Sequence, residues 1–201
     1  MKKLIVVVLV VLSVAASVGA AEVGSTSSEV GGSLKYWVPY SHLFDVYSMG
    51  YGAEVQYRYW FFEPFGVAVS VGAANWKVDS STEAFKPVRV DGGWMTMVPV
   101  GASGLFRLWD GGTWSLTFDA GVRYVKQMSD LKLANGRDVS VDDGIVSVVG
   151  LRGEVNVTEA LSVFADVEHQ DDIKKGEIDG GKMRNNALPA FAFDLGVTFK
   201  F

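Results

Sequence analysis

The sequence has 201 residues, a formal net charge of −5 at pH 7 and a hydrophobic content of 49%. It contains no cysteine, which excludes disulfide bonds, thiolate metal sites and cysteine nucleophiles. An acidic chain without basic clusters lacks the charge pattern of a nucleic-acid-binding protein. The length fits a single domain.

The N-terminal segment has the three-part layout of a secretory signal peptide. Lys2 and Lys3 precede a nearly unbroken apolar stretch, Leu4–Val14, and small residues for cleavage follow at Val18–Ala21. The apolar stretch is shorter than the about 20 residues that a transmembrane helix needs. We therefore predict a cleaved signal peptide over residues 1–21 and one mature domain over residues 22–201.

Beyond this segment, apolar and polar residues alternate with a period of two, the pattern of β-strands that have one apolar face. The pattern predicts eight strands: Val30–Val38, Met49–Trp60, Phe65–Gly72, Trp94–Leu108, Trp114–Tyr124, Ile145–Val157, Leu161–Glu168 and Phe191–Phe201. The last strand is the clearest, because every odd position in it is apolar. No later stretch is long enough for a membrane-spanning helix, so a mature protein in a membrane must be a closed barrel.

The connections between these strands alternate in length. Long polar connections, residues 77–93, 126–144 and 170–186, follow the third, fifth and seventh strands, and a shorter one, 39–48, follows the first. The second, fourth and sixth strands are each followed by only a few residues. Outer-membrane barrels have this asymmetry, with short periplasmic turns and longer external loops. The sequence therefore predicts an all-β fold, an eight-stranded antiparallel up-and-down transmembrane barrel.

The face opposite the apolar one consists largely of glycine, alanine, serine and threonine, with charges of both signs. Small residues suit the narrow lumen of a small barrel, and charges confined there can pair. A lipocalin-like barrel would instead place the apolar face inside, around a ligand. We predict that the charged face lies inside and fills the lumen. The expected lumen charge network comprises Glu54, Arg58, Arg107, Asp119, Arg123, Arg152, Glu154, Asp166, Glu168 and Asp194, with Lys35 and Lys200 on the same face.

Aromatic residues near the strand ends predict the two girdles that mark the membrane interfaces. The expected periplasmic girdle comprises Tyr57, Tyr59, Phe61, Phe65, Trp114, Phe199 and Phe201. The expected outer girdle comprises Tyr36, Tyr40, Tyr47, Trp76, Trp94 and Tyr124.

In its strand pattern, the chain resembles the small OmpA/OmpX-type outer-membrane β-barrels over nearly all of its mature length. The most specific match is in the last strand, where Asp194, Gly196, Phe199 and Phe201 fit the polar-x-Gly-x-x-aromatic-x-aromatic signal of that class. The resemblance implies the outer membrane of a Gram-negative-type cell and assembly by the outer-membrane machinery through this strand. It also implies contact with outer-membrane lipids and lipopolysaccharide. Full-length OmpA proteins carry a peptidoglycan-binding domain after the barrel, and we do not expect one here because the sequence ends at Phe201.

The sequence contains two histidines, His42 and His169. Some small outer-membrane barrels modify lipid A with an external histidine and a serine or aspartate, and His42, Asp79 and Ser80 would all lie on the external side. Nothing in their spacing brings them within hydrogen-bond reach, which a catalytic set requires. We therefore expect exposed loop histidines and predict no enzyme activity, no cofactor and no metal site.

The external loops are predicted to carry the specific contacts of the protein, because loops on a rigid scaffold usually do. Their acidic pairs, Asp142–Asp143 and Asp171–Asp172, lack the ligand spacing of a calcium loop. Their basic residues can contact lipid phosphates: Lys174, Lys175, Lys182 and Arg184. We predict a monomer with a structural or surface-interaction role. A lipid A-modifying enzyme and a periplasmic lipocalin-like carrier are the alternatives.

Overall fold

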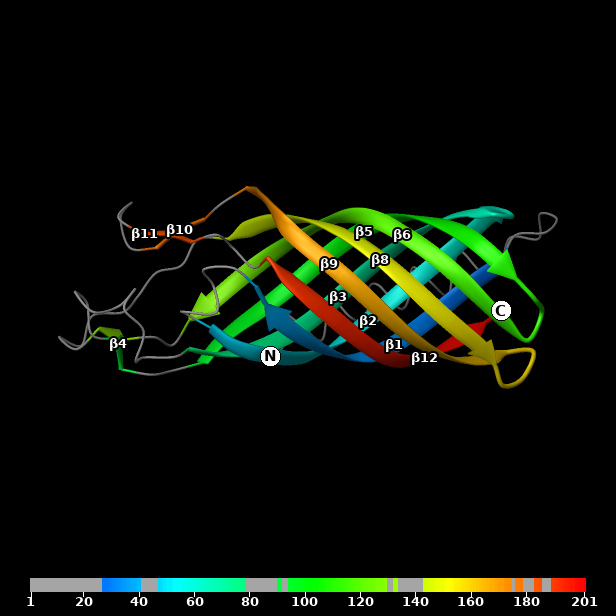
Figure 1. The fold of residues 1–201 in the computed structure, drawn as a ribbon, viewed down its shortest axis with the longest axis horizontal. Helices are drawn as coiled ribbons and strands as arrows, with labels where there is room; N and C mark the ends of the chain where they lie inside the picture. Colours follow the sequence, from blue (N-terminus) through cyan, green and yellow to red (C-terminus); the bar gives the residue numbers. More distant parts are fainter. Residues whose placement is uncertain are drawn as a thin grey trace.

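Eight long strands form one closed antiparallel barrel in the computed structural model (Figure 1). The structure describes residues 27–40, 47–78, 90–91, 94–129, 132–133, 143–174, 176–178, 183–185 and 189–201. The barrel strands are β1 (Ser27–Pro39), β2 (Tyr47–Phe62), β3 (Phe65–Val78), β5 (Trp94–Asp110), β6 (Trp114–Ser129), β8 (Gly144–Asn156), β9 (Leu161–Lys174) and β12 (Ala190–Lys200). Among these described residues, no helix is long and apolar enough to cross a membrane. The predicted signal peptide, residues 1–21, lies outside the described ranges.

Each barrel strand pairs with its neighbours in the chain, and β12 closes the barrel against β1 over a continuous ladder from Glu29↔Lys200 to Pro39↔Ala190. Three short connections lie at one end of the barrel, which we call the periplasmic end. The strand ends that border the long connections lie at the opposite, external end. They contain two small ladders, β4 (Val90–Asp91) with β7 (Lys132–Leu133) and β10 (Gly176–Ile178) with β11 (Met183–Asn185). Figure 1 shows β4, β10 and β11 beyond the same barrel end. The predicted up-and-down barrel is confirmed.

Several strands are longer than the sequence predicts, and the longest extensions, in β3, β6 and β9, lie at the external end. The third strand continues past Gly72 to Val78, and the seventh continues past Glu168 to Lys174. Pairing of Lys77 with Trp94 and of Asp171 with Ser147 extends these ladders. Backbone hydrogen bonds continue a ladder whether or not apolar and polar side chains alternate. The alternation therefore underestimates strand length where the barrel rises beyond the apolar band.

The apolar face of each strand points outward. On β12, the exposed fraction is 69% for Leu195 and 55% for Phe199, whereas it is 3% for Asp194 and 0% for Thr198. Leu195 pairs with Leu34 of β1, which is 74% exposed. An apolar belt of this extent is stable in lipid rather than in water, because exposed apolar patches on soluble proteins are small. This orientation is the opposite of the one that a lipocalin-like carrier requires.

Most of the predicted girdle residues are exposed on the outer face, namely Tyr36, Phe61, Phe65, Trp94, Trp114, Tyr124, Phe199 and Phe201, and two aromatic residues that were not predicted, Tyr51 and Trp109, join them. Tyr51 and Trp94 meet edge to face on the outer surface near the external end, with ring centroids 5.9 Å apart. Trp109 and Trp114 pack together at the periplasmic end, 3.6 Å between centroids. Trp76 was assigned to the outer girdle, and this is wrong: its exposed fraction is 1% and it points into the lumen. Trp76 occupies an even position of β3, the face that also carries Ala68 and Ala74. The side chain of Tyr47 lies outside the described residues.

Candidate functional site in the barrel lumen

Charged side chains from every barrel strand except β3 fill the central and periplasmic parts of the lumen. The structure places the predicted network residues on the inner face, where each occupies an alternate position of its strand. Their exposed fractions lie between 2% and 6% for Glu54, Arg58, Asp119, Arg123, Arg152, Glu154, Asp166, Glu168 and Asp194. The side chain of Arg107, close to the periplasmic end, is 13% exposed. Lys35 of β1 belongs to the same set, with a fully buried side chain.

Lys35 is the centre of what we call the central ion-pair group: Lys35, Glu54, Arg123, Glu168 and Asp194. The Nζ atom of Lys35 lies 2.8 Å from Glu168 Oε2, 3.2 Å from Asp194 Oδ2 and 3.3 Å from Glu54 Oε1. Three strands (β2, β9 and β12) supply these carboxylates, so one ammonium group ties together strands that are far apart in the sequence.

Arg123 completes the central ion-pair group from β6. Its Nη1 and Nη2 atoms donate to both carboxylate oxygens of Glu168, at 2.6 and 2.7 Å, the bidentate geometry that makes such pairs strong. Arg123 also lies 3.4 Å from Glu54. Glu54 and Glu168 thus each contact two cations, Lys35 and Arg123.

Arg152 and Asp166 lie beside the central group on β8 and β9. Arg152 Nε is 3.5 Å from Asp166 Oδ2, its Nη2 donates to Gln56 Oε1 at 2.8 Å, and its guanidinium lies 3.7 Å from the ring centroid of Phe164. Asp119 of β6 faces Gly150 of β8. A Cβ atom at Gly150 would lie 2.3 Å from Asp119 Oδ1, so the absence of a side chain at this position makes room for the carboxylate.

A second set of ion pairs lies between the central group and the periplasmic end. We call it the periplasmic ion-pair group; it comprises Glu29, Arg58, Arg107, Glu154 and Lys200. Arg58 is 3.0 Å from Glu29 and 3.3 Å from Glu154, and Lys200 is 2.9 Å from Glu154. Arg107 reaches Glu29 at 3.7 Å and also pairs with two acidic residues at the rim. Glu29 was missed because the first strand was predicted to begin at Val30. Its odd position in β1, shared with Lys35, was the available signal.

Trp60 closes the lumen at the periplasmic end. It is 1% exposed and packs with Ala68 and Leu105. The guanidinium groups of Arg58 and Arg107 lie 5.2 and 4.1 Å from its ring centroid, within the range of cation–π attraction. Trp60 therefore supplies a large apolar surface between two cations that the acidic residues hold in place.

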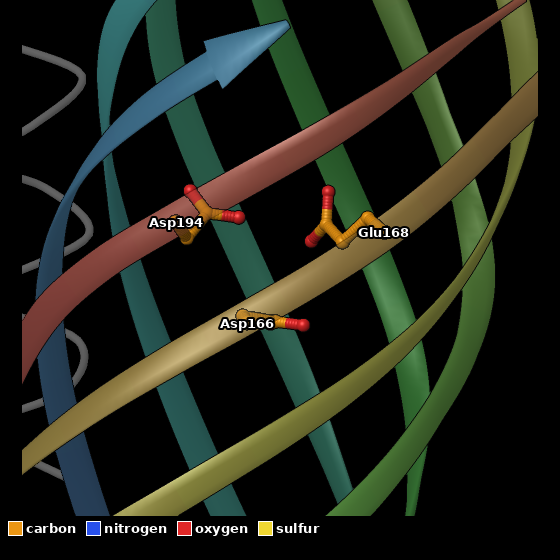
Figure 2. A group of neighbouring side chains, drawn as sticks. All are labelled: Asp166, Glu168 and Asp194. Atoms are coloured by element: carbon orange, nitrogen blue, oxygen red, sulfur yellow. The ribbon is translucent and has the colours of Figure 1, made fainter.

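Three acidic residues of the network are close enough together to raise the question of a metal. Oxygen atoms of Asp166, Glu168 and Asp194 lie within 4.8 Å of one another (Figure 2). The Lys35 ammonium already contacts Glu168 and Asp194, and Arg152 contacts Asp166. The positive charge that these carboxylates need comes from the chain itself, so the geometry is that of an ion-pair network.

The residues of the predicted assembly signal lie on both faces of β12. Asp194 points inward to Lys35, and Phe199 and Phe201 point outward with exposed fractions of 55% and 57%. A Cβ atom at Gly196 would lie 2.4 Å from the carbonyl oxygen of Gly32 and 2.5 Å from the Phe164 ring, so this position needs glycine for close packing. The role of the strand in assembly stays a prediction.

His169 lies on the outer face of β9 near the external end. Its Nε2 atom is 2.8 Å from the Tyr40 hydroxyl, and the two rings stack with centroids 5.3 Å apart. Burial raises the pKa of Tyr40, and the carboxylates of Asp171 and Asp172 raise it further. His42, Asp79 and Ser80, considered as a catalytic set, lie outside the described residues.

The loop residues considered as ligands are only partly described. Asp143 accepts hydrogen bonds from the Tyr124 hydroxyl and, at 3.0 Å, from the Gln127 backbone N–H, so this carboxylate binds β6 just beyond its ladder with β8. Asp142, Lys175 and Lys182 lie outside the described residues, as do the side chains of Lys174 and Arg184.

A layer of apolar side chains, not predicted from the sequence, lies inside the external part of the lumen. We call it the external apolar layer; it comprises Trp37, Trp76, Met95, Met97, Val125, Val146 and Val148, each with an exposed fraction of 4% or less. The signal was present in the strand parity. Trp37 is two positions after Lys35, and Val125 is two positions after Arg123, so both must face the lumen.

Comparison with known proteins places the fold among outer-membrane barrels. No protein-family model matches the sequence, and no curated protein matches it. The structure is similar to the outer membrane protein OprG from Pseudomonas aeruginosa, with a TM-score of 0.66 at 13% identity, over 87% of this chain and 95% of that one. It is also similar to a major outer membrane protein from Thermus thermophilus, with a TM-score of 0.59 at 14% identity, over 88% of this chain and 100% of that one. Neisserial surface protein A gives a TM-score of 0.53 at 11% identity, over 87% and 95% of the two chains. The fold is that of the small eight-stranded outer-membrane barrels, and the resemblance to OmpA/OmpX-type proteins holds at this level.

Proposed function

We propose that this protein is a monomeric integral outer-membrane barrel that has a structural role and presents its external loops for surface interactions. The observation that carries the proposal is the combination of an outward apolar belt with a lumen filled by ion pairs and tryptophans. Such a barrel binds lipid over its whole circumference and offers no open interior for a large ligand. Its specific contacts then come from the loops at the external end.

We further propose that the protein is not an enzyme. The described histidine, His169, contacts Tyr40 and Phe191, whose rings lie 5.3 and 5.2 Å from its own. The nearest outward hydroxyl on the neighbouring strand, Ser147, donates to the backbone oxygen of Asp171 at 3.2 Å. This arrangement resembles an interfacial aromatic cluster more than a nucleophile activated by a base. Lipopolysaccharide, the surrounding lipids and the outer-membrane assembly machinery are the partners that this location would provide.

The proposal is tested by fractionation and gel electrophoresis of the full-length protein. We expect the protein in the outer-membrane fraction after an alkaline wash, and a change in gel mobility when the detergent-solubilised sample is boiled. Recovery in the soluble fraction would refute the proposal. The enzyme alternative is tested separately by lipid A profiling of cells expressing wild-type protein or His169→Ala. We expect the two profiles to be identical to each other and to that of cells without the protein.

The division between a structural and a loop-borne role is tested by complementation. A deletion strain is transformed with the wild-type chain or with a chain in which residues 79–89 and 134–142 are replaced by short glycine–serine linkers. The measurement is the resistance of the cells to detergent, which reports the integrity of the outer membrane. If both chains restore it, the role belongs to the barrel. Restored resistance with the wild-type chain alone assigns it to the loops.

A further inference from the structure

The external apolar layer lies between the central ion-pair group and the external end of the barrel. On each of three strands, the inward positions change from charged to apolar on moving toward the long connections. This change occurs from Lys35 to Trp37 on β1, from Arg123 to Val125 on β6 and from Asp194 to Ala192 on β12. The exposed fractions of Trp37, Val125 and Ala192 are 4%, 2% and 0%. A solute entering from outside must pass this layer before it meets the ion pairs.

The layer is closely packed. The rings of Trp37 and Trp76 lie 6.1 Å apart at an angle of 42°. The cavity beside these rings, next to Met97 and Val125, has a volume of about 10 Å³ and reaches Arg123 and Gln170 on its polar side. This volume is at the lower limit for one water molecule. Gln127, Gln170 and Asp172 also face the lumen at this height, with Asp172 opposite Val146 in the ladder of β8 and β9. This cavity therefore holds at most one water molecule between the two tryptophans and Arg123.

An apolar constriction of this kind opposes ions more strongly than it opposes neutral molecules. An ion that enters it loses water of hydration and gains few polar contacts in return, and hydrophobic constrictions in channels close by excluding water. A network of paired charges can rearrange and hydrate, whereas valine offers an ion no hydrogen bond, methionine only a weak acceptor, and tryptophan a single N–H donor that a cation cannot use. We propose that the external apolar layer, and not the ion-pair network, is the barrier that closes this barrel to ions and hydrated solutes.

Substitutions that change polarity but preserve volume test the barrier. The inner triple variant Val125→Thr/Val146→Thr/Val148→Thr adds three hydroxyls to the layer. The matched control is Val122→Thr/Val149→Thr/Val167→Thr. It makes the same change on the outer face of β6, β8 and β9, where the three valines are 50%, 45% and 47% exposed. The network variant Lys35→Met/Asp194→Asn removes one charge of each sign from the central ion-pair group.

The measurement is potassium efflux from liposomes that contain the refolded full-length protein, with heat-dependent gel mobility as the test of folding. We expect background efflux from the wild type, the outer control and the network variant. The inner triple variant should raise efflux about tenfold, which corresponds to a barrier lowered by about 1.4 kcal/mol. Background efflux from a folded inner triple variant would overturn the proposal, as would high efflux from the network variant or from the wild type. If the inner triple variant does not fold, Met97→Gln replaces it. Raised efflux from folded Met97→Gln then supports the proposal, and background efflux overturns it.

Discussion

Replacing Lys35 with methionine should destabilise the barrel more than any conservative change on its outer face. The Lys35 side chain is fully buried and its ammonium lies 2.8 to 3.3 Å from three carboxylates. Lys35→Met preserves much of the side-chain volume but leaves Asp194 without its cation and removes one of the two cations that Glu54 and Glu168 contact. Breaking a buried ion pair by removing one partner costs roughly 3–5 kcal/mol. We expect the free energy of unfolding to fall by about that amount.

The free energy is measured by urea unfolding in detergent micelles or lipid vesicles, followed by tryptophan fluorescence and heat-dependent gel mobility. Leu34→Met is the matched control, because Leu34 is the neighbouring residue on the lipid-facing side and is 74% exposed. Its effect should stay within about 0.5 kcal/mol. In Lys35→Met/Asp194→Asn the unpaired carboxylate is also removed, so part of the loss should be recovered as a coupling energy of about 0.5–3 kcal/mol. A Lys35→Met barrel as stable as the Leu34→Met control would refute the assignment of the central ion-pair group as a stabilising element.

Three further changes test other parts of the structure. Gly150→Ala places a methyl group against Asp119 and should cost about 1–3 kcal/mol in urea unfolding, whereas Gly153→Ala, which meets nothing within 4 Å, should cost nothing measurable. Leu195→Arg introduces a charge at an outward position that is 69% exposed, near the middle of β12, and should lower the free energy of unfolding by about 2–4 kcal/mol in vesicles; an unchanged value would contradict the lipid-facing assignment. Phe201→Ala should reduce the amount of heat-modifiable barrel in cells while leaving the unfolding midpoint of the purified, refolded barrel unchanged. Normal assembly in cells would remove the proposed signal role of this residue.

The orientation of the side chains could be predicted because a strand alternates strictly. Asp194 and Leu195 are adjacent in the sequence, and their opposite burial follows from parity and from the requirement that a charge avoid lipid. The pairing inside the lumen could not be predicted in the same way. Lys35 and Glu168 are separated by 133 positions and meet in the lumen, over the intervening strand β12. Their contact depends on the stagger of the strands, which sets the height of each residue along the barrel axis.

The error at Trp76 has a different physical origin. An aromatic residue near a strand end suggested the membrane interface, although its even position in β3 placed it with Ala68 and Ala74 on the inner face. Alternation on β1 likewise places Trp37 inside, because it is two positions after the inward residue Lys35. Composition alone favours the interface for tryptophan, but the geometry of the strand decides the face. Parity, followed beyond the charged residues, would have revealed the external apolar layer.

The order of the layers along the lumen has a consequence for how this barrel can act. From the periplasmic end, the lumen contains Trp60 with the periplasmic ion-pair group, then the central ion-pair group, and then the external apolar layer. Charged solutes are opposed by the apolar layer, and apolar solutes are opposed by the ion pairs, because neither kind of solute can satisfy both surroundings. A single rearrangement of side chains would open only one of these barriers. If the apolar layer is the barrier to ions, as we propose, the ion pairs add a barrier to apolar solutes, and this arrangement agrees with the proposed role for the lipid-facing surface and the external loops.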